Sequence, residues 1–281
     1  MVAAVLVDLE EAIARQPDDQ EGAGQSVAAG DGLPPGFDDA ARPVPSAKQG
    51  YVQAVDYESL VEAAERADLV VRLAYRPGEY VIEGTPLLHA WPADRCGGQE
   101  FVDRVNAAFI CGRNATTEQD LEQALRQMVE VAVRALSPGI NDPFTAINCV
   151  DALGSAVCRV ARTGLPGPLR YDRRGKLRIV SPVTTFAGVV DTAFNQIRQY
   201  GRDKADVTIR LLEVIAVCGK QAASDDQRRS LLRHAKMVYE DSLGAIPQPR
   251  DRDDIRDRWE AAARALGAPA EAEFGEARPS W

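Results

Sequence analysis

The spacing of apolar residues divides the chain into a β-rich part followed by a mainly helical part. In the second part, apolar residues recur every three or four positions, the period of an α-helix that buries one face. This pattern predicts helices on both sides of a turn at residues 137–142, and at about 183–200, 205–222, 225–242 and 251–266. In the first part, YVQAV and LVVRLAY are typical of strands, and YESLVEAAERA between them predicts one helix.

The segment RPGEYVIEGTPLLHAW places Gly78, Val81, Gly84 and Leu87 three positions apart. The glycines suit turns with positive φ, and the residues between them suit short strands. The run resembles the hairpin of biotinyl and lipoyl-like barrel-sandwich modules. Those carriers need a lysine to acylate, and none occurs between Lys48 and Lys176, so a swinging-arm carrier is excluded and a structural or docking barrel remains.

These patterns predict an α+β protein in which a small β-rich, barrel-sandwich-like module precedes a predominantly α-helical domain. The N-terminal stretch is expected to hold a short connecting helix and then a disordered linker rich in Gly, Pro and Asp. The hairpin expected in LRYDRRGKLRIV is assigned to the helical domain. The predicted boundaries are 1–15 for the connecting helix, 16–49 for the linker, 50–95 for the β-rich module with one helix, 100–266 for the helical domain and 267–281 for a loose tail.

The charge distribution argues against a nucleic-acid partner. The formal net charge is −9, and residues 1–50 hold nine acidic and three basic side chains, so the remaining chain is nearly neutral. A broad basic surface, which phosphate backbones require, is therefore not expected. The opening MVAAVLV is too short for a membrane span or a signal peptide, which predicts a soluble, cytoplasmic chain as the sequence stands.

The residues that usually carry catalysis are sparse. Five cysteines are scattered without a C-x-x-C pair, and only His89 and His234 could accompany them, so we expect reduced, buried thiols rather than a zinc site or a disulfide framework. His89 is expected in an apolar strand and His234 on a helix surface. No P-loop, G-x-G-x-x-G, H-E-x-x-H or G-x-S-x-G motif occurs. A non-enzymatic role is favoured, and no metal or cofactor is expected.

The turn in RALSPGINDPF is the strongest local feature of the chain. Gly139 can end one helix in the left-handed conformation, Asp142 can cap the next, and Pro143 suits its first position. This account leaves Arg134 and Asn141 less well explained. A bound anion would meet the negative Asp142, and a metal would need more carboxylates, so a structural turn is favoured over a site. If a small ligand binds here, the candidate residues are Arg134, Ser137, Asn141, Asp142 and Thr145.

A second polar pattern follows on the helix predicted at 183–200. Asp191, Asn195 and Arg198 are spaced to share one face of this helix, opposite its apolar residues. They form either a solvated face or a strip that meets the Arg134 to Asp142 turn.

The run QALRQMVEVAVRALSPGINDPFTAINCVDAL closely resembles the signature of the bacterial membrane-protein family called domain of unknown function 2254. The likeness extends to residues 50–87 and to FNQIRQYG. Members of that family carry several N-terminal transmembrane helices before a soluble domain. The resemblance implies that this chain is the cytoplasmic part of a bacterial inner-membrane protein, and that residues 1–15 match the helix after the last span.

The missing membrane segment would then reflect a truncated gene, an internal start or a deliberately expressed soluble part. The expected partner is the membrane-embedded segment of a related protein, with homo-oligomerisation as a further expectation from the family. The function implied is assembly, gating or sensing. The alternative is a small-ligand, metal-binding or enzymatic domain that uses the Arg134 to Asp142 turn.

Overall fold

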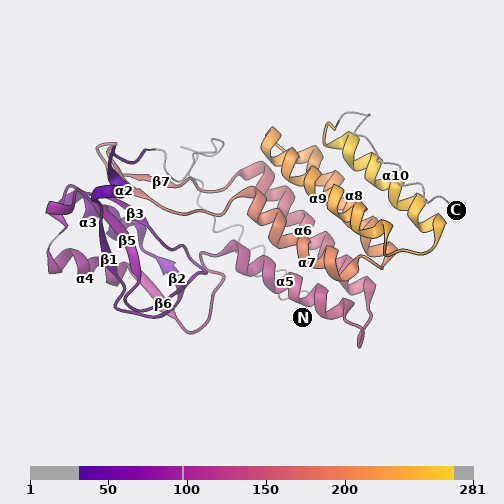
Figure 1. The fold of residues 1–281 in the computed structure, drawn as a ribbon, viewed down its shortest axis with the longest axis horizontal. Coiled ribbons are helices and arrows are strands. Elements are labelled where there is room, and N and C mark those ends of the chain that lie inside the picture. Colours follow the sequence, from indigo (N-terminus) through magenta and orange to yellow (C-terminus); the bar gives the residue numbers. More distant parts are fainter. Residues whose placement is uncertain (1–31, 97, 269–281) are drawn as a thin grey trace. The chain divides into compact units, whose positions relative to one another are not determined.

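The computed structural model describes residues 32–96 and 98–268, which form two compact units (Figure 1). The β-rich unit contains residues 32–124 and 164–185, and the helical unit contains residues 125–163 and 186–268. The predicted α+β class, with a helical C-terminal part, is confirmed. The helix predicted at 1–15 lies outside the described residues, as does the predicted tail beyond residue 268.

The β-rich unit is built on two sheets, which do not close into a barrel within the described residues. In spatial order, the larger sheet contains β1 (Arg42–Pro45), β5 (Pro86–Trp91), β3 (Val70–Leu73), β8 (Leu177–Val180) and β7 (Leu169–Tyr171). The smaller sheet contains β4 (Tyr80–Val81), β2 (Gly50–Val55) and β6 (Phe109–Gly112). The Gly78 to Leu87 run therefore does not form one hairpin, because β4 and β5 belong to different sheets.

Helices complete the core of this unit. They are α2 (Phe37–Ala40), α3 (Tyr57–Arg66), the short 3-10 helix η1 (Ala93–Arg95) and α4 (Gln99–Ala108). Asp56 begins α3 by accepting a hydrogen bond from the Ser59 amide at 3.0 Å. The inward face of α3 carries Leu60, and it packs against α4 and β8. The resulting core buries Val52, Phe109 and Ile179 completely.

The prediction of a disordered linker over residues 16–49 is wrong at its C-terminal end. Residues 42–45 form β1, which pairs antiparallel with β5 and buries Val44 opposite Leu88. Because β1 is at the edge of its sheet, Pro43 and Pro45 can occupy it without breaking a central ladder. The prolines that made the segment resemble a linker are thus compatible with an edge strand.

The structure also divides the two units differently from the sequence-based boundaries. The hairpin of β7 and β8, expected within the helical domain, joins the larger sheet, where β8 pairs in parallel with β3. The register places Val71 opposite Ile179, more than a hundred positions later in the chain. Helix α4 and strand β6, also placed in the helical domain, belong to the β-rich unit. A parallel partner so distant in sequence leaves no mark in the local apolar pattern.

The helical unit confirms the predicted helices. They are α5 (Leu121–Leu136), whose first turn lies in the β-rich unit, α6 (Pro143–Thr163), α7 (Phe186–Gly201), α8 (Ala205–Gln221), α9 (Asp225–Leu243) and α10 (Pro249–Ala265). Helix α6 packs against α7 and α8, and α10 covers α8 and α9 (Figure 1). Among the described helices, α6 alone is long and apolar enough to cross a membrane, a test that a buried core helix also passes.

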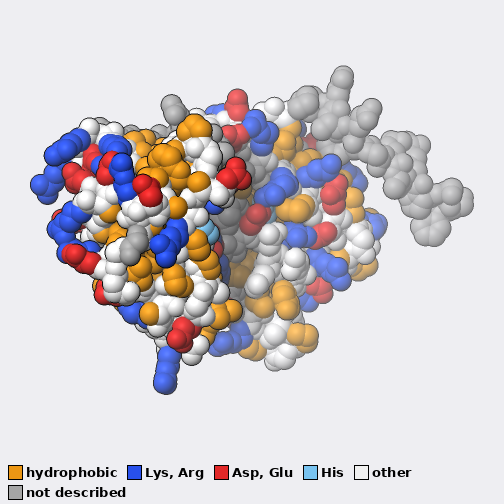
Figure 2. Space-filling view, turned by 60° about the vertical axis from the view of Figure 1, so that its left-hand side comes forward, with side chains coloured by type: hydrophobic (Ala, Val, Ile, Leu, Met, Phe, Trp, Pro, Cys, Tyr) orange, Lys and Arg blue, Asp and Glu red, His pale blue; other side chains and the backbone are white. Residues whose placement is uncertain are grey.

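Charged side chains of both signs are mixed on the molecular surface. On the face shown in Figure 2, lysine and arginine side chains alternate with acidic ones, and apolar side chains lie among them. No single basic field covers this face.

Candidate functional site

The predicted candidate turn is held together by its own hydrogen bonds. The carboxylate of Asp142 accepts the Thr145 amide at 3.1 Å and also the Thr145 hydroxyl. These bonds, the hydroxyl first, hold the pKa of Asp142 below its usual value. The Ser137 hydroxyl donates to the Arg134 carbonyl at 2.7 Å. The structure thus brings Ser137, Asp142 and Thr145 together as helix-ending and helix-starting groups.

Asn141, rather than Gly139, takes the left-handed conformation at this turn. Its φ is 48°, a region that asparagine enters more readily than most residues with a side chain. Its amide donates to the Ser137 carbonyl at 2.9 Å, and the Asp142 amide donates to the Ala135 carbonyl at 2.8 Å. The structural reading of the turn therefore explains Asn141, which the sequence left open.

Two apolar side chains of the turn face outward. Phe144 is 76% exposed and Ile140 is 55% exposed, and the Arg134 residue is also exposed. We call Ile140 and Phe144, with the turn between them, the apolar corner. Isolated exposed apolar residues are common, but two on one short turn favour a contact surface over a polar ligand site.

The polar strip on α7 is partly exposed: the Asp191 side chain is 39% exposed and the Arg198 side chain is 13% exposed. Asp191 accepts a hydrogen bond from Arg233 at 2.6 Å and lies 2.7 Å from Nε2 of His234. Arg198 pairs with Asp241. All three partners lie on α9, so the strip joins α7 to α9.

His234 is fully buried, so its expected position on the helix surface is wrong. Its spacing with Leu231, Ala235 and Val238 is that of one buried helix face, a signal that the sequence contains. Burial lowers the pKa of His234, while the hydrogen bond to Asp191 opposes that shift. Among the residues that the structure describes, none is a hydrogen-bond partner of Nδ1 of this ring.

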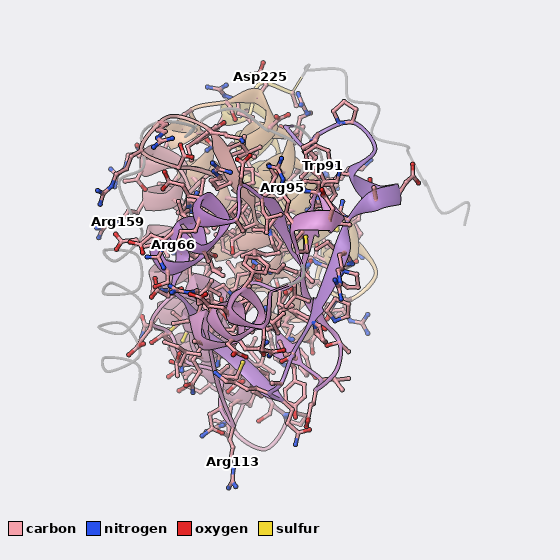
Figure 3. The ribbon with its side chains drawn as sticks, turned by 90° about the vertical axis from the view of Figure 1, so that its left-hand side faces the viewer. Arg66, Trp91, Arg95, Arg113, Arg159 and Asp225 are labelled. Atoms are coloured by element: carbon pink, nitrogen blue, oxygen red, sulfur yellow. The ribbon has the colours of Figure 1, made fainter. Side chains whose placement is uncertain are left out.

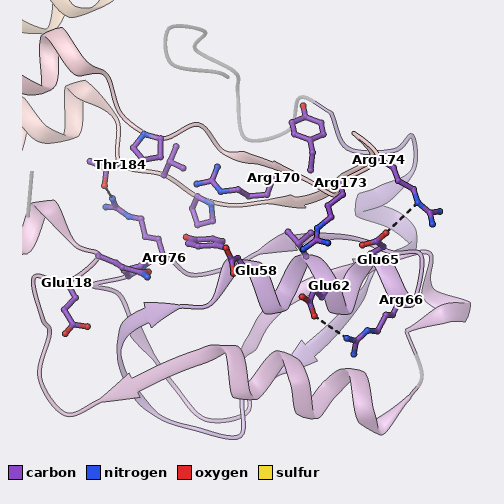
Figure 4. Close-up of a pocket in the computed structure, with 18 residues that line it drawn as sticks. Glu58, Glu62, Glu65, Arg66, Arg76, Glu118, Arg170, Arg173, Arg174 and Thr184 are labelled. Carbon is purple, nitrogen blue, oxygen red and sulfur yellow. Dashed lines mark hydrogen bonds and ion pairs between the residues drawn. The ribbon is translucent and has the colours of Figure 1, made fainter. Parts of the chain in front are cut away.

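A second candidate site is a cleft of about 1020 Å³ in the β-rich unit, between α3 and the β7–β8 hairpin (Figure 4). Three glutamates and Arg66 line it from α3, and arginines line it from the hairpin. We call it the charged cleft and define it by Glu58, Glu62, Glu65, Arg170, Arg173 and Arg174. Tyr57 and the prolines Pro77, Pro166 and Pro182 add apolar surface.

Buried contacts fix one end of the charged cleft. Arg76 makes a bidentate ion pair with Glu122, with nitrogen–oxygen distances of 2.9 and 3.1 Å. The same guanidinium donates to the Thr184 hydroxyl at 2.5 Å. Because Glu122 is only 7% exposed in its side chain, this pair is a rigid wall rather than a free binding group.

Arg170 is held over the aromatic ring of Tyr57. The guanidinium carbon lies 5.2 Å from the ring centroid, and Arg170 also donates to the carbonyls of Gly167 and Leu169. Burial raises the pKa of Tyr57, and the charge of Arg170 opposes this shift. The tyrosine therefore stays protonated and serves as an apolar platform beside the arginine wall.

The hairpin that carries the arginine wall is anchored by a partly buried ion network, in which Arg178 and Asp172 are buried. Arg178 donates to Asp172 at 2.8 Å and to Asp68 at 2.9 Å. Lys176 pairs with the same Asp68, and together these bonds hold the pKa of Asp68 far below its usual value. Asp68 ends the α3 segment with a φ of 50°. The network ties the hairpin to α3, and so it sets the distance between the two walls of the cleft.

Sequence reasoning missed the charged cleft. The run LRYDRRGKLR was interpreted only as a hairpin, although four arginines and a lysine in ten residues are an unusual density. The sequence signal for the opposite wall is the spacing of Glu58, Glu62 and Glu65 on α3, which places the three glutamates on one face of that helix. Among residues 32–96 and 98–268, no three His, Cys, Asp or Glu side chains lie together where they could hold a metal ion.

Comparison with known proteins places the chain in a family. Residues 1–217 match the family described as "Predicted membrane protein (DUF2254)". Uncharacterized proteins of Mycobacterium bovis and Mycobacterium tuberculosis are each 31% identical to this chain over 249 residues.

The match covers 88% of this chain and 46% of those relatives, so the chain spans about half of their length. No solved structure matches. The family match covers well over half of the chain, as the signature around the turn predicted, and the chain therefore belongs to the DUF2254 family of predicted membrane proteins.

Proposed function

We propose that this chain is the non-enzymatic, extramembrane sensing part of a membrane protein. In this proposal the charged cleft binds a small ligand that carries both an anionic and a cationic group. The observation that carries it is the placement of three glutamates on one wall and three arginines on the other (Figure 4). Membership of a family of predicted membrane proteins supports the setting.

The two walls do not neutralise one another closely. Glu65 and Arg174 approach each other across the cleft only to 4.0 Å, and Arg174 is 86% exposed in its side chain. Glu62 pairs with Arg66 at 3.3 Å on the surface of α3, where both side chains are more than half exposed. Exposed pairs of this kind contribute little, so a ligand that offers better geometry to both walls can replace them. A carboxylate or phosphate suits the arginine wall, and an amine suits the glutamate wall.

Binding is favoured over catalysis by the residue types of the cleft. Its described lining contains neither histidine nor cysteine, the side chains that most often act as a base or nucleophile near neutral pH. The raised pKa of Tyr57 also makes its phenol a poor base.

Thermal unfolding with a set of small probes tests the proposal. We would compare dipolar probes, glutamate, dipeptides and phosphoethanolamine, with inorganic phosphate and with spermidine. A dipolar probe at a hundred times its Kd is expected to raise Tm by about 5–10 °C. Inorganic phosphate and spermidine, which carry charges of one sign only, should give smaller shifts in Tm, because each engages one wall only.

Three variants locate the effect. Arg173→Ala and Glu62→Ala should each weaken binding of the dipolar probe in calorimetric titration. Arg113→Ala is the matched control, because Arg113 is an exposed arginine of the same unit that projects well away from Arg66 (Figure 3). Equal binding by the wild type and both wall variants would refute the proposal, as would the absence of any shift with every dipolar probe.

The apolar corner favours a second role, docking onto the membrane-embedded segment of a related protein. We would co-express the chain with the half of the Mycobacterium tuberculosis relative that this chain does not match and place a photo-cross-linking amino acid at Phe144. A cross-link to that half is expected. Val217, which is 52% exposed on α8, is the matched control position. Equal cross-linking at the two positions would contradict a specific contact.

A further inference from the structure

Cys158 on α6 and Cys218 on α8 have their sulfur atoms 3.3 Å apart. Both are free thiols in this structure. We propose that they form a reversible disulfide that ties α6 to α8, which makes this pair an oxidation site of the protein. The proposal is independent of the charged cleft, because both cysteines belong to the helical unit.

The approach of the two helices brings these thiols together. At Gly154, an added Cβ would lie 2.2 Å from Cγ1 of Val214, so α6 and α8 approach each other closely where α6 has no side chain. One helical turn later on each helix, the next facing pair is Cys158 and Cys218. The contact between the thiols therefore follows from the packing of the two helices rather than from chance orientation of two surface groups.

The two cysteines differ in the way that the chemistry needs. Cys158 is partly exposed, whereas Cys218 is fully buried and can also donate to the Gly154 carbonyl at 3.5 Å. The hydrogen bond between the two thiols holds the pKa of Cys158 below the usual value of a thiol, and the charge of Arg162 adds to that shift. The same bond and burial raise the pKa of Cys218. Cys158 is thus the reactive thiolate near neutral pH, and Cys218 is the resolving thiol.

The reaction needs an oxidant of the hydroperoxide class. The Cys158 thiolate attacks one oxygen of hydrogen peroxide, the O–O bond breaks, and hydroxide leaves, which takes up a proton to become water. This step oxidises Cys158 to a sulfenic acid. The sulfur of Cys218 then attacks the Cys158 sulfur, the S–O bond breaks, and the hydroxyl leaves as water with the thiol proton. Two thiols and one peroxide yield one disulfide and two waters.

The other three cysteines provide internal comparisons, and burial also raises the pKa of the partly exposed Cys111. Cys149 lies on the same helix α6, where burial raises its pKa to about 11. Cys96 is buried, and its thiol donates to the carbonyls of Ala90 and Pro92. These environments disfavour thiolate formation, so oxidation should be selective for the Cys158 and Cys218 pair.

Peptide mapping of the full chain after treatment with hydrogen peroxide tests the proposal. The expected product is a cross-linked peptide pair containing Cys158 and Cys218, with the mass loss of two hydrogens, which disappears on treatment with dithiothreitol. Oxidation should raise Tm by about 5–15 °C, because the cross-link closes a long loop of the unfolded chain. The rate of cross-linking should rise with pH around a midpoint below the usual pKa of a thiol.

Variants separate this site from general oxidation. Cys158→Ser and Cys218→Ala should each abolish the cross-link and the Tm shift, and Cys149→Ser should retain both. The map of the wild-type chain stands even if the buried Cys218 variant fails to fold. Oxidation of Cys158 to a sulfinic acid without a cross-link, a disulfide that uses another cysteine, or no reaction at either position would each overturn the proposal.

Discussion

The candidate site of the β-rich unit and the candidate turn of the helical unit are built from polar residues in different ways. In the β-rich unit, ion pairs join segments that are far apart in the chain, such as Asp68 with Arg178 and Arg76 with Glu122, and further charges line an open cleft. In the helical unit, the polar groups of the turn between α5 and α6 form hydrogen bonds with near neighbours in the chain, as Asp142 does with Thr145. Its helices meet through close apolar packing, as at Gly154, and through ion pairs such as that of Arg198 with Asp241. The polar groups of a motif that stands out in the sequence can therefore bond to one another, whereas the charged cleft is assembled from residues far apart in the chain.

The largest expected effect tests the long-range network of the β-rich unit. Arg178→Ala removes a side chain that is 5% exposed and leaves the fully buried carboxylate of Asp172 without its cation. Breaking a buried ion pair from one side costs about 3–5 kcal/mol. We expect a loss of this size in the free energy of unfolding, measured with urea.

Arg174→Ala is the control for this network, since Arg174 lies on the same hairpin but is 86% exposed in its side chain. A substitution at such a surface position is expected to change stability by no more than about 0.5 kcal/mol. Equal losses in the two variants would show that the buried network is not what holds the hairpin in place.

The corresponding test in the helical unit is Gly154→Ala. The added Cβ would clash with Val214, and overpacking of this kind costs about 1–3 kcal/mol. Alanine is the better helix former, so a variant that is more stable than the wild type would show that the helices can separate freely. Because Val214→Ala removes the clashing methyl groups, the double variant should recover part of the loss, which a double-mutant cycle measures.

The local elements of both units could be predicted from the sequence. The apolar period of three to four residues located α5 to α10 closely, and Asp142 was identified as the cap that begins α6. The edge strand β1 was missed because proline marks both linkers and sheet edges. The contact of β8 with β3 was missed because parallel pairing across a hundred residues depends on tertiary packing alone.

The same distinction explains the candidate sites. Arg134 to Thr145 lie within twelve consecutive residues, so their spacing could be interpreted directly. The charged cleft instead combines α3 with a hairpin about a hundred residues later, and the Cys158 and Cys218 contact joins two helices 60 residues apart. Neither grouping can be recognised before the packing of the elements is known.

Acid should weaken the helical unit through His234. Burial lowers the pKa of His234 in the folded protein, so the unfolded chain binds this proton at higher pH than the folded chain does. The contribution of neutral His234 to the free energy of unfolding is fully present above the pKa of about 6.5 that histidine has in the unfolded chain. It is lost as the pH falls below that value, by at most about 1.4 kcal/mol per pH unit.

Urea unfolding between about pH 7.5 and 5.5 measures this loss. Asp191, Arg233 and Arg198 are the charged groups that act on the imidazole. His234→Gln should flatten the acid side of the profile. If the variant keeps the wild-type slope, another group is responsible.

A smaller effect is expected when the cap of α6 is removed. Asp142→Ala deletes the acceptor for the Thr145 amide and should lower Tm by about 2–4 °C. Asp142→Asn keeps an acceptor and should retain most of the stability. If Asp142→Ala left Tm unchanged, the carboxylate would not serve as a cap, and a ligand-binding role for the Arg134 to Asp142 turn would regain support.

The smallest expected effect concerns the open charges of the cleft. Arg173 is exposed on the hairpin and lines the charged cleft, so Arg173→Ala should change the free energy of unfolding by no more than about 0.5 kcal/mol. Arg76→Ala, at the buried end of the same cleft, should cost several times more because it removes the bidentate ion pair with Glu122, whose side chain is only 7% exposed. Urea unfolding of the two variants measures this difference. If Arg173→Ala were as destabilising as Arg76→Ala, the arginine wall would be a structural element, and the contrast between the open charges of the cleft and its rigid frame would not hold.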